Sequence, residues 1–386
     1  MEIRKASIYE KFNCIADKCP ENCCKGWRIH IDDDTVQKYL EMKGLKGVCI
    51  RLFMHTDDFM PYFSKKSIRC PLMTHDRYCS IQRRIGEDFM PEICRRFPRD
   101  MRNYGAFAEY HLDLSCTHAA FLMLENRDAE KLIISEGTSD LPVFGNNEDE
   151  DFLKTLDESR REMLSLFEYS KGFGIDGLDN AFKRALDIAT SDHFRALSVQ
   201  NPESGKNTGP GLFPLPLEIL NEMVNNSLYK DRMLYYSPFF YSLFRQYFKY
   251  FDSLTPTKGK HRYRAYLEAF INGYPDIIPH MYEYVRYSIE REYLTTFEDY
   301  SFIKRILDTL LCANVILLLE TVYFTRHKQM SMQTEARIIS LCERRARHND
   351  YILKKLSDTF KLDTNMFRRD LSPNFTPKPH QEPSSE

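Results

Sequence analysis

The chain has 386 residues, of which 42% are hydrophobic and 28% charged, and its formal net charge is −2. This length allows two or three domains with buried cores, and the small net charge provides no field that would attract nucleic acid. The longest apolar run, around residues 315–319, is broken by Glu320 and falls far short of the roughly 20 residues that cross a membrane, so we expect neither a nucleic-acid partner nor a membrane span.

Short elements are predicted in the first third of the chain. The alternating residues 27–31 predict a strand, and Asp32 begins a run of N-cap residues for a helix that ends near Lys43. A turn at residues 103–105 between alternating segments predicts a hairpin over residues 101–115. Three further short helices are predicted at residues 80–87, 91–96 and 117–125.

Long helices dominate after residue 125. Apolar residues at helical spacing predict helices at residues 151–169, 217–232, 238–252, 260–271, 279–296, 301–326 and 331–359. Residues 201–216 are rich in glycine and proline and predict a surface loop. We predict a mainly α fold: an N-terminal cysteine-rich metal-binding module with short strands (residues 1–125), packed on a C-terminal helical body (residues 126–368), and a disordered tail (residues 369–386).

Eight of the eleven cysteines form one pattern near the N-terminus: Cys14, Cys19, Cys23, Cys24, Cys70, Cys79, Cys94 and Cys116. Clustered thiols indicate either metal ligation or a disulfide framework. The first 13 residues lack the apolar segment of a signal peptide, which predicts the cytoplasm, where thiols stay reduced. We therefore predict metal ligation for these eight, with disulfides or simple packing of thiols as alternatives. Cys49, Cys312 and Cys342 stand apart and are expected in the core.

The spacing of the cysteines leaves the kind and number of metal centres open. Eight cysteines allow one tetra-cysteine site with four bystanders or two such sites, and four thiolates suit either zinc or an iron–sulfur cluster. Only Cys19-x3-Cys23 resembles a zinc knuckle, and the wide spread of the others favours a cluster wrapped by loops. The C-x3-C-x2-C pattern of enzymes that cleave S-adenosylmethionine reductively is absent, because Gly26 stands in its third position.

The neighbours of these cysteines carry a family resemblance. They read Cys14-Ile15, Glu21-Asn22-Cys23-Cys24-x-Gly26-Trp27, Cys70-Pro71-Leu72, Cys79-Ser80-Ile81-Gln82 with Gly86, Cys94-Arg95-Arg96-Phe97-Pro98-Arg99 and Leu114-Ser115-Cys116. Over about residues 9–125 the chain resembles the bacterial flagellin lysine N-methylases. One departure follows the last cysteine, where the family usually has Pro-Glu and this chain has Thr117-His118.

The resemblance implies an S-adenosylmethionine-dependent enzyme that methylates lysine side chains of flagellin, which would be its protein partner. It also implies an iron–sulfur cluster held by some of the eight cysteines. The residues alone indicate only a thiolate metal module on a helical body. A non-enzymatic protein that stores, delivers or is stabilised by zinc or an iron–sulfur cluster is therefore the alternative function.

Other residues give weaker signals, and no catalytic or donor-binding residue is assigned. Gly172-x-Gly174-x-x-Gly177 follows a predicted helix rather than a strand, so we interpret it as a loop and not a nucleotide site. Arginines 95, 96 and 99 are candidates to pair with thiolates or with the donor's carboxylate, or are surface residues. Histidines 30, 111 and 118 are candidate ligands or packed side chains, and Trp27 is expected to shield the cluster from water. The aromatic residues of 235–251 predict a helix core or, by cation–π contact, a lysine-binding cage.

Overall fold

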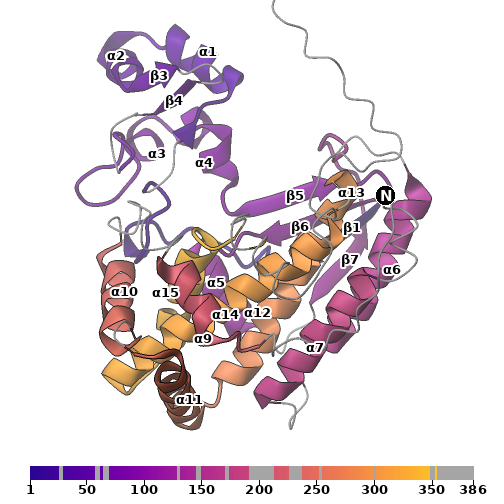
Figure 1. Cartoon of the computed structure of the whole chain (residues 1–386). Helices are drawn as coiled ribbons and strands as arrows, with labels where there is room; N and C mark the ends of the chain where they lie inside the picture. Colours follow the sequence, from indigo (N-terminus) through magenta and orange to yellow (C-terminus); the bar gives the residue numbers. More distant parts are fainter. Residues whose placement is uncertain are drawn as a thin grey trace, which may run out of the picture. The chain divides into compact units, whose positions relative to one another are not determined.

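The computed structural model describes residues 1–25, 29–56, 61–63, 69–127, 131–144, 149–169, 174–190, 213–225, 237–251, 254–299, 301–347 and 353 (Figure 1). The fold is mainly α-helical, with seven short strands in these ranges. Two compact units are formed. The first comprises Met1–Phe144, Leu217–His280 and Val315–Arg347, and the second comprises Gly145–Pro216, Met281–Asn314 and His348–Glu386.

A four-stranded sheet in the first unit has the order β5-β6-β1-β7. The hairpin of β5 (Arg99–Asn103) and β6 (Phe107–Leu112) pairs Met101 with Tyr110, and Gly105 takes the left-handed conformation that its turn requires. Strand β1 (Glu2–Ala6) runs parallel to β6, and β7 (Leu132–Glu136) runs antiparallel to β1. Strands from both ends of the first 140 residues therefore build one sheet.

The same unit contains a small layer, which consists of the three-stranded sheet β2-β4-β3 and short helices packed with it. Its elements are β2 (Ile29–His30), α1 (Asp33–Glu41), α2 (Gly44–Leu52), β3 (Met54–Thr56), β4 (Pro61–Phe63), α3 (Ser80–Arg84), η2 (Glu87–Phe89) and α4 (Glu92–Arg96). Asp32 caps α1 by accepting a hydrogen bond from the Thr35 amide at 3.0 Å. The core of this layer is formed by Ile29, Ile31, Tyr39, Ile50, Phe63, Leu72, Ile81 and Met90.

Other helices of the first unit are α5 (Thr117–Glu125), α9 (Leu217–Met223), α10 (Pro238–Phe251), α11 (Pro256–Gly273) and α15 (Met332–Glu343), with the C-terminal part of α14 (Phe302–His327) and a short η1 (Ala16–Lys18). Helix α5 packs on α15, where the hydroxyls of Thr117 and Ser340 lie 2.8 Å apart. The buried aromatic side chains of α10 are Phe240, Phe244, Tyr247 and Phe251. These rings therefore form helix core, and the predicted alternative of a lysine-binding cage is not supported for them.

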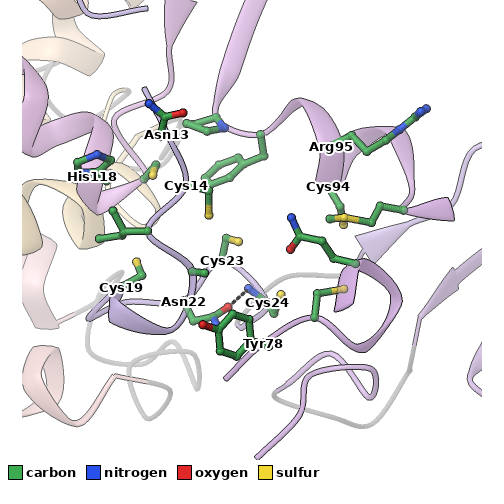
Figure 2. Close-up of a pocket in the computed structure, with 18 of the residues that line it drawn as sticks. Asn13, Cys14, Cys19, Asn22, Cys23, Cys24, Tyr78, Cys94, Arg95 and His118 are labelled. Atoms are coloured by element: carbon green, nitrogen blue, oxygen red, sulfur yellow. Dashed lines mark hydrogen bonds between the residues drawn. The ribbon is translucent and has the colours of Figure 1, made fainter. Parts of the chain in front are cut away.

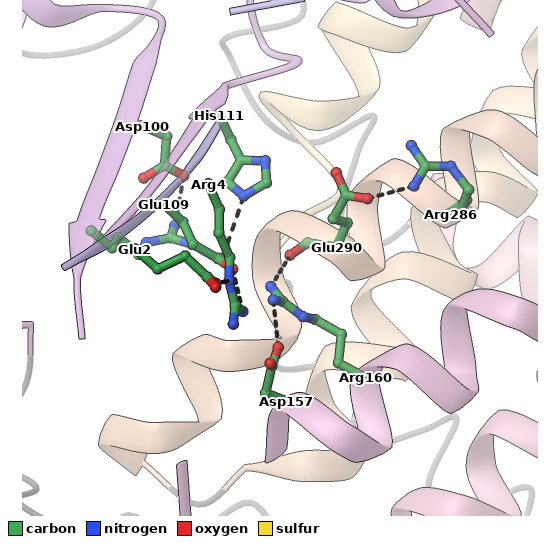
Figure 3. A network of polar contacts seen from close by, with 10 residues as sticks. Glu2, Arg4, Asp100, Glu109, His111, Asp157, Arg160, Arg286 and Glu290 are labelled. Atoms are coloured by element: carbon green, nitrogen blue, oxygen red, sulfur yellow. Dashed lines mark hydrogen bonds and ion pairs between the residues drawn. The ribbon is translucent and has the colours of Figure 1, made fainter. Parts of the chain in front are cut away.

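The second unit contains α6 (Glu150–Leu166), α7 (Gly174–Ala189), η5 (Tyr293–Thr295), α13 (Thr296–Asp299), most of α12 (Ile277–Glu292) and the first part of α14. Its interior holds charges as well as apolar side chains (Figure 3). The Arg160 guanidinium is 2% exposed, pairs with Asp157 at 2.8 Å and donates to the Glu290 carbonyl at 2.9 Å. Arg286 pairs with Glu290 and Glu283.

Most predicted helices are confirmed, with boundaries shifted by a few residues. Strands β1, β3, β4 and β7 and helices α2 and α7 were not predicted. The predicted loop at residues 172–177 is wrong from Gly174 onward, because α7 begins there. Of the helix predicted at residues 331–359, the structure shows α15 to Glu343 and a turn at residues 344–347, and residues 348–352 and 354–359 lie outside the described residues. Trp27, residues 201–212 of the predicted loop and the predicted disordered tail lie outside the described residues, and the domain boundaries at residues 125 and 368 stay a prediction.

None of the helices in the described ranges combines the length and hydrophobicity needed to cross a membrane. The expected core position of Cys312 and Cys342 is confirmed, since both are fully buried. The expectation for Cys49 is wrong: it lies exposed on α2, beside the exposed Val48 and Leu52, because this short amphipathic helix buries only Gly47 and Ile50.

Candidate functional site

A cavity of about 380 Å³ in the first unit collects the predicted cysteines (Figure 2). Seven of the eight line it: Cys14, Cys19, Cys23, Cys24, Cys79, Cys94 and Cys116. The eighth, Cys70, is not among the lining residues, but its amide donates to the Cys24 carbonyl at 2.8 Å. Segments separated by as much as 102 positions in the sequence, from Cys14 to Cys116, therefore bring their thiols to one place.

The loop that carries Cys19, Cys23 and Cys24 is held by hydrogen bonds to the turn before Cys79. Asn22 accepts from the Cys24 amide at 2.7 Å and donates to the Arg77 carbonyl at 3.1 Å. Arg77 adopts a left-handed conformation and donates to the carbonyls of Cys19 and Pro20. Such a backbone conformation is uncommon outside glycine and marks a turn fixed by its surroundings.

Arg337 within α15 and Arg344 at its C-terminal end hold the same loop from another side. Arg337 donates twice to the buried Glu21 carboxylate, at 2.7 and 2.5 Å, and the Ser237 hydroxyl donates to it at 2.9 Å. Arg344 donates to the Ser115 carbonyl at 2.7 Å and to the Glu21 carbonyl at 3.1 Å. Because Ser115 precedes Cys116, Arg344 fixes the positions of two cysteine segments at once.

Cys79 and Cys94 reach the cavity from the small layer. Cys79 precedes α3 and Cys94 lies within α4. Together with Cys70 they pack against the apolar core of that layer. Cys79 is further tied to the preceding turn by a bridge to Met73. The short helices that the sequence predicts here therefore serve to place thiols beside an apolar core.

Several thiols at or beside the cavity have pKa values raised by burial. Desolvation raises the pKa of Cys70 to about 11, that of Cys116 to about 12, and that of Cys94 further still. A hydrogen bond from Cys24 and the charge of Arg344 lower the pKa of Cys23 to about 7, and the same hydrogen bond raises that of Cys24. Without a cation, most of these thiols stay protonated at neutral pH.

The chemistry of this donor set fits a thiolate-bound metal. All eleven cysteines lie in the described ranges and none forms a disulfide bond, which excludes the predicted disulfide alternative for this structure. Among the described residues, no three His, Cys, Asp or Glu side chains are already placed so that they could hold one ion together. Binding therefore requires the thiols to lose protons and turn toward the metal, as soft ligands of zinc and iron–sulfur clusters do.

The other predicted candidates separate into those at the cavity and those away from it. His118 lines the cavity, stacks on Phe121 and has its pKa lowered by burial, whereas His111 is buried in the sheet beside Glu109 at 3.4 Å (Figure 3). His30 lies on β2 and is not among the lining residues. Of the three histidines, only His118 is placed to contact a ligand in the cavity.

The three predicted arginines also differ in their position relative to the cavity. Arg96 is outside the lining and pairs with Glu92 at 2.7 Å on the surface of α4. Arg95 lines the cavity, but Figure 2 shows its guanidinium directed away from the centre. Arg99 lines the cavity with its guanidinium over the rings of Phe12 and Tyr9, at 5.4 and 6.0 Å, and has no ion-pair partner within the described ranges.

Several lining residues were not predicted from the sequence. Glu21, Asn22 and Gln82 stand in the segments that carry the resemblance, so their position beside cysteines was the available signal. Arg77 carried no such signal, and nothing in the sequence connects Arg337 or Arg344 to cysteines more than 200 residues earlier.

The fold and the cavity define a mainly α-helical protein whose N-terminal third presents clustered thiols around a ligand-sized space. The chain is similar to the Lysine-N-methylase of Salmonella typhimurium, with 28% identity over 158 residues, and to that of Salmonella choleraesuis, with 30% identity over 158 residues. Each match covers 37% of this chain and 38% of the relative, so the chain spans well under half the length of these two proteins.

A third relative, the Flagellar biosynthetic protein FliU of Salmonella muenchen, is 30% identical over 137 residues. That match covers 34% of this chain and 81% of FliU. No family model and no solved structure matches the chain. The chain belongs to the flagellin lysine N-methylase family, which confirms the resemblance seen in its cysteine motifs.

Proposed function

We propose that the protein transfers methyl groups from S-adenosylmethionine to lysine side chains of flagellin, and that its cavity cysteines hold an iron–sulfur cluster. The names of the relatives, a lysine methylase and a flagellar protein, support the reaction and the substrate. The observation that carries the cofactor is the convergence of seven thiols on one cavity. Zinc is the alternative metal for the same donor set.

The chemistry of lysine methylation sets the requirements on the site. The lysine ammonium, with a pKa of about 10.4, must first lose a proton to a base or to solvent. The neutral amine then attacks the methyl carbon, the carbon–sulfur bond breaks, and its electron pair stays on sulfur. The products are methyl-lysine and S-adenosylhomocysteine. An amine is already nucleophilic, so the protein needs mainly to align the two groups and exclude water.

The lining residues provide features that suit a bound methyl donor. Arg99 is a cation without an ion-pair partner in the described part of the chain, which suits the donor's carboxylate. Phe12 and His118, with ring centroids 5.8 Å apart, offer apolar surface next to it. A bound cluster would supply rigidity to the cysteine loops or, with one iron open, a further contact for the donor.

Anaerobic purification followed by iron, zinc and sulfide counts tests the cofactor, and the reaction is tested by incubating the protein with flagellin and labelled S-adenosylmethionine. We expect iron with matching sulfide and label on flagellin lysines. A metal-loaded protein that leaves flagellin unlabelled would favour the non-enzymatic metal-binding alternative. Release of deoxyadenosine during turnover would contradict direct displacement by the amine.

Cytoplasmic location is part of the same proposal. The absence of disulfide bonds among the eleven cysteines agrees with a reducing compartment. Fractionation of cells that produce the protein, with a cytoplasmic and a periplasmic marker enzyme, tests this location. We expect the protein to follow the cytoplasmic marker, and recovery with the periplasmic marker would contradict it.

A further inference from the structure

The charged side chains that line the cavity differ in whether the fold already uses them. The arginines and glutamates of the lining are Glu21, Arg77, Glu87, Arg95, Arg99 and Arg344. Three of them hold the cysteine loop through the hydrogen bonds described above, and Arg95 directs its guanidinium away from the centre (Figure 2). The remaining two are Glu87 and Arg99, and within the described part of the chain neither side chain has an ion-pair or hydrogen-bond partner.

The backbone that carries Glu87 is fixed between α3 and α4. Glu87 begins the 3-10 helix η2, and the preceding Gly86 has a φ of 131°, which residues with a side chain rarely adopt. The Gly86 amide donates to the Ile81 carbonyl at 3.0 Å, and the hydroxyl of the fully buried Tyr39 donates to the Phe89 carbonyl at 2.5 Å. A well-anchored turn therefore presents an exposed carboxylate at the rim of the cavity.

The charges around Glu87 leave its carboxylate available. Arg83 and Arg96, on the flanking helices, form ion pairs with other acidic residues, and Arg84 is exposed outside the lining. Of the two lining carboxylates that the structure describes, Glu21 is buried and bonded to an arginine. Glu87 is thus the lining carboxylate that can bind an incoming cation.

The size of the cavity separates the two substrates of the proposed reaction. A space of about 380 Å³ can take a small donor and part of one side chain, but the body of a protein substrate must stay outside. The substrate therefore meets the rim first, and its lysine arrives as an ammonium group, because the pKa of a free lysine is about 10.4. The Glu87 carboxylate complements that charge, whereas Arg99 would repel it.

We propose that Glu87 is a specificity-determining residue that binds the ammonium group of the substrate lysine as it enters the cavity. This inference rests on the proposed function, since it takes a protein lysine as the methyl acceptor. Glu87 binds the lysine in its protonated form, and the proton must leave before the amine can attack the methyl group. Glu87 therefore contributes to substrate capture and not to the methyl-transfer step.

Steady-state kinetics of Glu87→Gln with flagellin and labelled S-adenosylmethionine test the proposal. The substitution keeps the shape of the side chain and removes its charge. We expect the KM for flagellin to rise about threefold to fivefold, as for the loss of an exposed ion pair, with kcat unchanged. The affinity for S-adenosylmethionine and the metal content should equal those of wild type.

Glu92→Gln is the matched control. Glu92 is also an exposed glutamate of the small layer, but it pairs with Arg96 and does not line the cavity, so its substitution should leave the KM unchanged. Ionic strength adds a readout that a structural role would not affect. The difference in KM between wild type and Glu87→Gln should shrink between about 0.05 M and about 0.5 M salt, because salt screens exposed charges.

Binding of flagellin to protein loaded with S-adenosylhomocysteine requires no turnover and separates this inference from the proposed function. We expect Glu87→Gln to weaken this binding by the same threefold to fivefold factor, about that of one exposed ion pair. Labelled flagellin with equal KM values in wild type and variant, or weaker binding of S-adenosylmethionine alone, would overturn the role of Glu87. Unlabelled flagellin whose binding still depends on Glu87 would instead contradict the proposed reaction.

Discussion

The interior of the second unit and the cavity of the first unit bury polar groups in different ways. In the second unit, Arg160 and Arg286 are buried among Asp157, Glu283 and the Glu290 side chain and carbonyl, so charge is balanced inside the protein. In the cavity of the first unit, the thiols of Cys94 and Cys116 are buried without an ion-pair partner of their own, and desolvation raises their pKa values. The first arrangement stabilises the fold, whereas the second is suited to an external ligand.

Removing one charge from the buried ion pairs of the second unit is expected to have the largest effect on the free energy of unfolding. Arg160→Met keeps most of the volume but removes the buried cation that pairs with the buried Asp157, which retains the exposed Arg161. We expect the free energy of unfolding to fall by about 3–5 kcal/mol, measured by urea unfolding, with metal content unchanged. Arg161→Met is the control: its side chain is 66% exposed and pairs with the same Asp157, so we expect a loss of less than about 1 kcal/mol. Equal losses would show that burial does not decide the outcome.

Glu21→Gln tests whether the α15 arginines position the cysteine loop. The variant weakens the bonds from Arg337 and Ser237, and we expect it to lower the free energy of unfolding by about 1–3 kcal/mol and also to reduce metal content. Glu343→Gln is the matched control, because it also weakens an arginine–carboxylate pair. Glu343 pairs with Arg347 at 2.6 Å at the end of α15, and neither residue lines the cavity. Glu343→Gln should destabilise the protein while metal content is retained. Metal loss in both variants, or in neither, would contradict the positioning role.

Arg99→Gln tests the proposed contact with the donor's carboxylate. We expect binding of S-adenosylmethionine to weaken about tenfold, which corresponds to about 1.4 kcal/mol. Decarboxylated S-adenosylmethionine, which lacks the group that Arg99 would contact, should bind wild type and variant equally. Arg96→Gln, at the surface pair with Glu92, should change neither affinity. Equal weakening for both ligands in calorimetry would remove Arg99 from the donor site.

Glu320 represents a third way of burying a polar group, because its carboxyl group stays protonated and neutral. Both its carboxyl oxygens are buried without a hydrogen-bond partner in the described residues, and desolvation, with the charge of Glu335, raises its pKa well above the usual 4.5. Because the unfolded state then ionises at lower pH than the folded state, this group reduces stability as the pH rises above 4.5. We expect the free energy of unfolding to decrease less steeply with pH in Glu320→Gln than in wild type, by at most about 1.4 kcal/mol per pH unit, in urea unfolding from pH 5 to 8. An unchanged slope would show that Glu320 ionises normally.

Local sequence signals predicted the elements that depend on nearby residues. The Asp32 cap, the turn with Gly105 and the helix at residues 117–125 each rest on contacts within a few residues, and all are present. The parallel pairing of β1 with β6 joins residues about 100 positions apart, so no local pattern indicates it. Two glycines in the short α2 weakened its helical signal.

At the candidate site, too, local sequence patterns could not predict contacts between distant residues. The prediction of a cysteine site followed from the number and neighbours of the cysteines, but their convergence on one cavity depends on tertiary packing. Arg337 and Arg344 reach Glu21 from more than 300 residues away, and only the folded chain reveals that contact. The structure therefore shows that seven of the eight predicted cysteines line one cavity, and which residues hold their segments there, while their role as metal ligands stays a prediction.

Thiols from distant segments converge on one cavity, and we propose that they bind metal there. X-ray absorption at the iron and zinc edges of anaerobically purified protein tests it most directly. We predict a first shell of four sulfur atoms at about 2.3 Å from the metal, consistent with full ligation by cysteine and sulfide. A first shell made of oxygen and nitrogen only, in protein whose eight cysteines all react with an alkylating reagent, would contradict the account.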